Sequence, residues 1–272
     1  MHGKSSPYYF CGNYHFNKLM PEKKETDSDD SKELLFLKQE LDRAHLLRDT
    51  LVRIVNHDLR GPMGNLKSIL SLILEGQMDA ETAKAFFEQA DAGIEKSVKM
   101  LEELVEWGGA NSVFRERKVE ELSLSELVER AFAEHDEKVK NKNLNLINRV
   151  DQELKVPYDE KALNVILRQL LSNAIKFTKP TGTVEVTSKE IEGLVYLAVA
   201  DSGVGIPDEM KPELIDMKKG SRRLGTDNEK SAGVGLFICQ DLISERRGVI
   251  NVLDNLPTGT IIEFSLPDQT VD

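Results

Sequence analysis

The stretch NHDLRGPMGN, residues 56–65, brings a histidine together with an acid, a base and a helix breaker. A neutral imidazole has one nitrogen free to attack an electrophile, while its other nitrogen carries a proton. A carboxylate that accepts this proton, such as Asp58, makes the ring of His57 more nucleophilic. Arg60 lies three residues after His57 on the same helix face, where it can balance incoming negative charge. The stretch therefore predicts an activated histidine nucleophile.

The apolar pattern around this stretch places the histidine on the outside of a helix. At about 100° per residue, His57 falls roughly 200° from both Val55 and Leu59, so we expect it to face solvent. Pro62 removes a backbone N–H and costs about 3 kcal/mol inside a helix. A breaker of this size beside an exposed histidine predicts a functional bend. A simple kink and an inactive surface histidine are the alternatives.

Three polar residues repeat along a predicted helix at 159–178. Gln169, Asn173 and Lys176 fall at i, i+4 and i+7, on a face separate from the apolar stripe of Leu163, Leu167, Leu170, Ala174 and Phe177. Amide oxygens are hard ligands suited to Mg²⁺, and a lysine supplies charge for phosphates. A solvated helix face is the alternative for such a set.

An acid and glycines follow the predicted strand LVYLAVAD. Asp201 can accept a hydrogen bond from an adenine amino group, while Gly203 and Gly205 let the backbone approach the base. Further along, GVGL leads directly into a predicted helix, whose first backbone N–H groups form a seat for phosphates. Ordinary tight turns are the alternative for both segments.

The elements that position these residues fall into two groups. A long amphipathic helix at 32–75, the break EGQMDA and a second helix that ends at WGGANS predict a helical hairpin. Each helix has one apolar face, and a hairpin cannot bury both faces alone. We therefore expect a homodimer that completes a four-helix bundle. The alternative is a hairpin packed on the other domain of the same chain.

Beyond residue 112 the pattern is mixed. SLSELVERAFAEHDEKVKNK, PYDEKALNVILRQLLSNAIKFTKPTG and GLFICQDLIS predict helices, and TVEVT, LVYLAVAD, VINVL and GTIIEFSLP predict strands. This order predicts a two-layer α/β sandwich with helices over one face of a mixed sheet. The chain is thus expected to be multi-domain: a flexible tail at 1–31, an all-α hairpin at 32–110 and an α/β domain at 111–272.

Composition excludes several classes of function. The 272 residues carry a formal net charge of −11 and no dense basic run, which argues against a nucleic-acid partner. No apolar run approaches the roughly 18–20 residues of a membrane span, and the first residues do not read as a signal peptide. Two cysteines at positions 11 and 239 give no disulfide or zinc spacing. A cytoplasmic protein is expected.

Five motifs together resemble a known family. VNHDLRGPMGNL is similar to the H-box of sensor histidine kinases, and RQLLSNAIKFT, DSGVGIP, SAGVGLFICQDLI and PTGTIIEFSLP resemble their N-box and three glycine boxes, in the same order. The resemblance implies autophosphorylation of His57, with Asp58 as its acid–base partner, and transfer to an aspartate on a response-regulator receiver domain. It also implies ATP and Mg²⁺ as cofactors. Since the sequence has no recognisable sensor segment, the stimulus is expected from a separate sensor or upstream protein, from the first 50 residues, or from a region outside this sequence.

The resemblance implies a set of nucleotide-site residues as well. Mg²⁺ is expected on Asn173 and Gln169, and the irregular segment after the first glycine box is expected to be a lid over ATP. The residues expected to bind nucleotide are Asn173, Lys176, Phe177, Asp201, Gly203, Gly205, Ile206, Arg222, Arg223, Gly233, Gly235, Leu236 and Thr260.

Two departures from the family pattern keep other functions open. Gln169 stands where the kinases usually show an asparagine and where ATP-hydrolysing relatives carry a glutamate. Glutamine cannot act as a base, which argues against an ATPase-driven conformational machine. The lid also lacks the paired phenylalanines usual in the family. These departures favour the other alternative, a phosphotransfer or scaffold protein with a degenerate ATP-binding domain.

Overall fold

The computed structural model describes isolated helical positions between 34 and 52, and then residues 60–75, 80–111, 117–211 and 234–267. Contacts between Cα atoms divide the chain after Arg48, and Asp49–Asp272 form one unit. Within the described ranges, no helix combines the length and apolar content needed to cross a bilayer.

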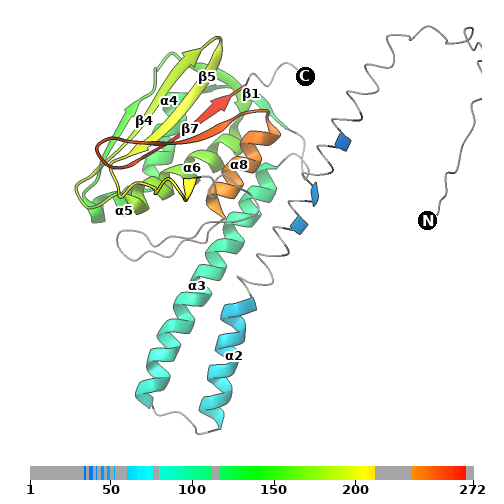
Figure 1. The fold of residues 1–272 in the computed structure, drawn as a ribbon, viewed down its shortest axis with the longest axis vertical. Helices are drawn as coiled ribbons and strands as arrows, with labels where there is room; N and C mark the ends of the chain where they lie inside the picture. Colours follow the sequence, from blue (N-terminus) through cyan, green and yellow to red (C-terminus); the bar gives the residue numbers. More distant parts are fainter. Residues whose placement is uncertain are drawn as a thin grey trace, which may run out of the picture. The chain divides into compact units, whose positions relative to one another are not determined.

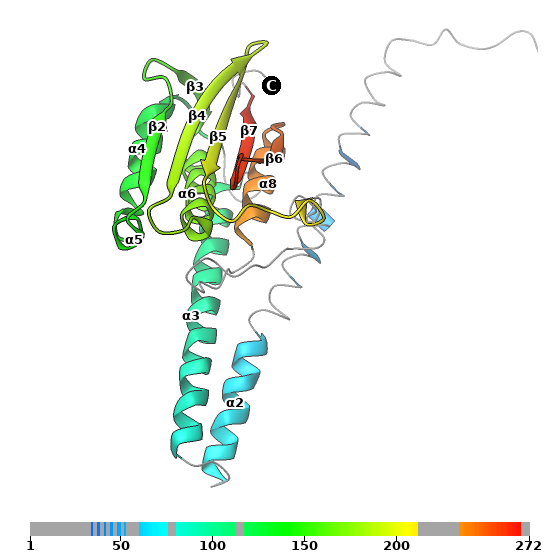
Figure 2. The same cartoon turned by 60° about the vertical axis from the view of Figure 1, so that its left-hand side comes forward.

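Helices α2 (Arg60–Leu74) and α3 (Ala80–Ala110) form the predicted hairpin, with the chain turning at Glu75. Figures 1 and 2 show the two helices side by side. The break at EGQMDA and the end at WGGANS are therefore confirmed. His57 and Asp58 lie outside the described residues, whereas Arg60 begins α2 and is exposed.

Apolar side chains remain exposed along this hairpin. They are Met63, Leu70, Leu72 and Leu74 on α2, and Phe86, Phe87, Ile94, Val98, Leu101 and Val105 on α3. A groove between the helices is lined by Leu66, Phe87, Ala90 and Ile94, together with two acidic residues. The rest of the described chain thus leaves these positions uncovered.

The second half of the unit is an α/β domain with a five-stranded sheet in the order β2-β4-β5-β7-β6. Its strands are β2 (Asn145–Arg149), β4 (Thr183–Ile191), β5 (Leu194–Asp201), β6 (Ile250–Asp254) and β7 (Thr260–Leu266). Strands β2 and β4 are parallel and the other pairs antiparallel, so the sheet is mixed as predicted. Helices α4 (Leu124–Ala133), α6 (Glu160–Phe177) and α8 (Gly235–Glu245) cover one face (Figures 1 and 2).

The region before α6 differs from the sequence prediction. The expected single helix over 123–142 is two helices, α4 and α5 (Asp136–Lys142), because the backbone turns at His135, whose N–H bonds to the carbonyl of Phe132. Three strands were also missed: β1 (Val119–Ser123), β2 and β3 (Lys155–Asp159). Strands β1 and β3 form a separate antiparallel pair, and β2 lies at a sheet edge. Short strands with charged residues give little apolar alternation.

Helices α6 and α8 run antiparallel across the sheet. Gly235, at the start of α8, lies against Gln169 in the second half of α6. Further along, the Cys239 thiol donates to the carbonyl oxygen of Ile166. At the far end, the Arg246 guanidinium lies 3.7 Å from the Asp159 carboxylate, directly before α6. One end of this helix pair therefore lies at the glycine boxes, and the opposite end lies at a buried cluster of charged residues.

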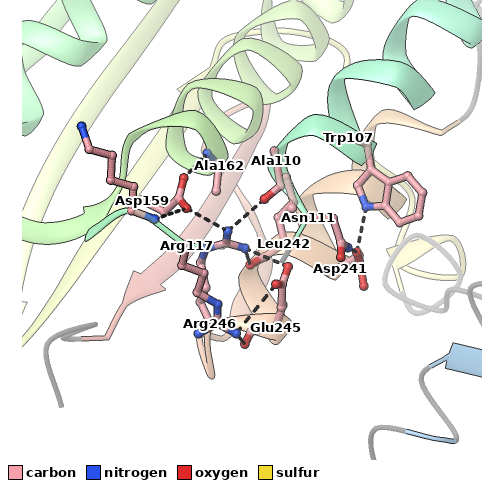
Figure 3. Close-up of polar contacts among 11 residues, drawn as sticks. Trp107, Ala110, Asn111, Arg117, Asp159, Ala162, Asp241, Leu242, Glu245 and Arg246 are labelled. Carbon is pink, nitrogen blue, oxygen red and sulfur yellow. Dashed lines mark hydrogen bonds and ion pairs between the residues drawn. The ribbon is translucent and has the colours of Figure 1, made fainter. Parts of the chain in front are cut away.

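Arg246 is the centre of that cluster and has no exposed side-chain surface. Its guanidinium donates to the carbonyl oxygens of Leu242 and Ala110, each at 3.0 Å, and to the Glu245 carboxylate at 2.9 Å (Figure 3). A buried charge is stable only when it is paired and hydrogen-bonded. The bond to Ala110 therefore fastens the end of α3 to the end of α8.

A second buried acid strengthens this junction. One oxygen of the Asp241 carboxylate accepts from the Trp107 indole N–H and from the Asn111 side-chain amide, both at 2.7 Å (Figure 3). Asp241 and Asn111 are fully buried, and Trp107 is 3% exposed. Glu106 also pairs with Arg168 on α6. One side of the last turns of α3 is thus bonded to α8 and α6.

Replacing Asp241 with alanine removes the acceptor that Trp107 and Asn111 share. We expect the free energy of unfolding to fall by about 3 kcal/mol, because a hydrogen bond to a charged group contributes about 1.5–3 kcal/mol. Urea unfolding followed by far-UV circular dichroism measures the loss. Ser244→Ala, on the exposed side of the same helix, is the matched control and should change stability by less than about 0.5 kcal/mol. Equal losses in both variants would contradict the role given to Asp241.

Candidate functional site

Asp201 occupies the last position of β5 and faces the helices. Side chains alternate along a strand, so the phase that buries Leu197 and Val199 also buries Asp201. Its cross-strand neighbours are Val184 on β4 and Thr260 on β7. An acid is thus placed at the rim of an apolar core, where a charged group is unusual unless it has a function.

The Asp201 carboxylate is held through one of its two oxygens. Oδ1 accepts from the backbone N–H of Gly203 at 2.8 Å and of Thr260 at 3.2 Å. Burial raises the pKa of Asp201 to about 6, because desolvation disfavours the charged form, and the two N–H donors oppose that rise. Both bonds from described residues fall on Oδ1, so Oδ2 is available to accept from an adenine amino group.

The first glycine box packs directly against the end of α6. The Val204 N–H donates to the carbonyl oxygen of Phe177, and a Cβ at Gly203 would overlap that same oxygen. Glycine is therefore required at position 203 by a close approach to protein backbone. Gly205 and Ile206 follow, both half-buried.

Helix α6 brings its predicted polar residues to the same end. Asn173, Lys176 and Phe177 are all half-buried in its last turns, and the Lys176 ammonium lies 5.0 Å from the centre of the Phe177 ring. Phe177 is less buried than the other predicted members of the apolar stripe, which are all buried. These three side chains therefore lie at the helix end that contacts the glycine box.

Gln169 has a different environment from Asn173. It is only 7% exposed, and its side-chain oxygen lies 2.5 Å from the position that a Cβ on Gly235 would take. The sequence placed it on a polar face, whereas the structure packs it under the start of α8. Asn173, by contrast, is half-buried in the last turns of α6.

The start of α8 fits a phosphate seat. The helix begins at Gly235, its first turn has no acid, and the preceding residue, Val234, makes no side-chain cap. Uncapped N–H groups and the helix dipole favour an anion at this end. Gly235 and Leu236 are half-buried, and Thr260 is buried beside Asp201.

The structure does not describe the remaining residues predicted for the site. His57, Asp58, Arg222, Arg223 and Gly233 lie outside the described residues, as does most of the predicted lid. Among the residues that are described, no group of three or more His, Cys, Asp or Glu side chains is arranged to hold a metal ion.

Two residues of the site were missed by the sequence reasoning. The Asn255 side-chain amide donates to the backbone oxygen of Asp201 at 2.8 Å. Gly259 has a φ of +129°, and a Cβ there would overlap the same oxygen. Gly259 lies inside the third glycine box, so that motif could have identified it. Asn255 lies just before the box, and no local sequence pattern identifies it.

Comparison with known proteins agrees with this geometry. Residues 158–270 match the family described as histidine kinase-, DNA gyrase B- and HSP90-like ATPase. The sensor protein KdpD of Clostridium acetobutylicum is 28% identical over 243 residues, which are 88% of this chain and 27% of the relative. The adaptive-response sensory kinase SasA of Synechococcus elongatus is 27% identical over 230 residues, or 80% of this chain and 59% of SasA. The chain thus spans between about a quarter and three fifths of these two relatives.

Solved structures share the fold. Histidine kinase ThkA, in complex with the response regulator protein TrrA, has a TM-score of 0.64 at 24% identity, covering 87% of this chain and 67% of that chain. Acinetobacter baumannii histidine kinase AdeS has a TM-score of 0.58 at 19% identity, covering 78% and 98%. Residues 158–270 thus match the family described as histidine kinase-, DNA gyrase B- and HSP90-like ATPase, and the chain is similar to sensor histidine kinases in sequence and fold.

Proposed function

We propose that this chain is an ATP-dependent protein-histidine kinase that autophosphorylates His57 and passes the phosphoryl group to an aspartate of a response-regulator receiver domain. The proposal rests chiefly on Asp201, a buried acid with one oxygen held by backbone N–H groups and the other available to an adenine amino group. The order of motifs along the chain supports the same function.

The described residues have distinct tasks in binding ATP. Asp201 accepts from the adenine amino group, and the N-terminus of α8 receives phosphate oxygens. Lys176 adds positive charge at the same end of α6. Phosphoryl transfer depends mainly on positioning and electrostatic stabilisation, so these contacts supply most of what the reaction requires.

The transfer step uses His57 and Asp58. The unprotonated ring nitrogen attacks the γ-phosphorus in line, a P–N bond forms, and the P–O bond to the leaving ADP breaks. The proton on the other ring nitrogen is held by Asp58, which stabilises the imidazolium as it forms. Arg60, exposed at the start of α2, balances the phosphoryl charge. When Mg²⁺ is bound, Asn173 is the amide expected to hold it, and the ion neutralises phosphate charge.

The proposed working form is a homodimer. Exposed apolar patches on a helical hairpin are typical of surfaces that a partner covers. A second copy of the hairpin has the matching apolar face, and the two together make a four-helix bundle. The receiver domain of a response regulator is the proposed acceptor, and an upstream sensor the proposed source of the stimulus.

His57→Gln tests the kinase against its alternatives. With radiolabelled ATP and magnesium, we expect acid-labile, base-stable label on the wild-type chain and none on His57→Gln, because glutamine cannot form a phosphoramidate. His45→Gln is the matched control and should retain the label. Free phosphate without protein label would support the ATPase alternative, and neither product would support the scaffold with a degenerate domain.

The raised pKa of Asp201 predicts a pH dependence of nucleotide binding. Above pH 6 the carboxylate is ionised and accepts strongly, whereas protonation below pH 6 weakens Oδ2 as an acceptor. We expect the Kd for ATP to rise about tenfold between pH 7.5 and pH 5, the loss of one hydrogen bond to a charged group. Titration calorimetry measures it. Asp201→Asn should bind ATP more weakly at pH 7.5, and its Kd should change much less with pH because asparagine does not titrate. The titration of ATP itself affects both proteins equally, so the difference between them reports on Asp201.

Charge on the hairpin should separate the dimer. We expect sedimentation velocity to show a dimer for the wild-type chain and a monomer for the double variant Phe87→Asp, Ile94→Asp, because two unpaired charges cannot be buried in the bundle. Glu95→Lys, on an exposed position beside this face, is the control and should remain dimeric. A wild-type chain that is monomeric at micromolar concentration would contradict the proposed assembly.

A further inference from the structure

We propose that Asn255 is a positioning residue for base recognition, which holds the peptide group that aims the Asp201 carboxylate at adenine. This inference rests on the proposed ATP-binding function. It concerns the first residue of the turn between β6 and β7, which precedes the third glycine box and belongs to none of the five motifs.

The Asp201–Ser202 peptide group is held at both ends. Its oxygen accepts from the Asn255 side-chain amide at 2.8 Å, and its N–H donates to the carbonyl oxygen of Thr183 at 3.0 Å. The orientation of this peptide group determines where the next residues lie. Gly203, two residues after Asp201, supplies the N–H that holds Oδ1. A rotation of the peptide group would therefore misplace the carboxylate.

Asn255 is itself fixed in place. Its backbone N–H donates to the carbonyl oxygen of Gly259 at 3.1 Å, which closes the turn. Gly259 lies so close to the oxygen of Asp201 that no larger residue fits. The next residue, Thr260, donates its N–H to Oδ1 of Asp201. Hydrogen bonds from this turn and the residue after it thus hold both the backbone oxygen and the carboxylate of Asp201.

The same turn is tied to the segment after the first glycine box. Lys211 bonds to Asp208 at 2.5 Å and to Asp254, next to Asn255, at 2.6 Å. These ion pairs lie at the surface and add little stability. They place the turn beside the residues that follow Ile206.

Two roles of Asn255, forming the turn and donating a hydrogen bond to Asp201, can be told apart by the chemistry of its side chain. A structural turn residue can be asparagine or aspartate, because both favour turns. A donor to the Asp201 oxygen can only be asparagine of the two, since an aspartate oxygen would repel a carbonyl oxygen at 2.8 Å. The order of binding among Asn, Ala and Asp at position 255 therefore distinguishes positioning from turn formation.

The test uses the full-length chain with ATP and GTP. We expect the Kd for ATP to rise about five- to tenfold in Asn255→Ala and further in Asn255→Asp, with a smaller preference for ATP over GTP. The KM for ATP in autophosphorylation should rise in parallel, while the rate at saturating ATP stays within about twofold, because the transferring phosphate is not touched. Asn251→Ala, earlier on β6, is the control and should bind ATP as the wild type does.

Melting temperatures of all variants accompany the binding data. If Asn255→Asp binds ATP and selects against GTP as the wild type does, the inference is overturned and the proposed kinase stands. If the wild-type chain binds ATP but acquires no label on His57, the proposed function fails while this inference is still decided by the binding series. A wild-type chain that binds no ATP overturns both.

Discussion

The buried guanidinium of Arg246 is the constraint on which the arrangement of this unit depends. It has no access to water, and its two terminal nitrogens bond or pair with groups at the ends of three helices. The carbonyl of Ala110 closes α3, Glu245 closes α8, and Asp159 caps the start of α6 through Ala162. Burying such a charge is costly, and only this convergence of helix ends offsets the cost.

Because α6 and α8 are joined at one end, the residues that meet at their opposite end are determined as well. The helices are antiparallel, so the end away from Arg246 carries Asn173, Lys176 and the first turn of α8. The polar site is therefore built at the open end of a rigid apolar layer. Asp201 enters that layer in phase with the core residues of β5, and the described residues hold its carboxylate through Oδ1.

Helix α3 serves two different surfaces along its length. Its last turns are buried through Trp107 and Asn111 in the α/β domain, whereas Ile94, Val98 and Leu101 remain exposed. The exposed apolar part is the surface on which the proposed homodimer rests. The hydrogen bonds from Trp107 and Asn111 to Asp241 join the end of α3 directly to α8.

The sequence by itself determined the hairpin, the strands from β4 to β7, the helices α6 and α8, and the place of Asp201 at a strand end, because each of these has a local periodicity or a motif. Only the tertiary structure decided the rest. Gln169 was placed on a polar face, yet α8 covers it, and the contacts of Asp241 with Trp107 and of Asn255 with Asp201 join residues far apart in the chain. Periodicity describes one element at a time, whereas burial and hydrogen-bond partners depend on which elements meet.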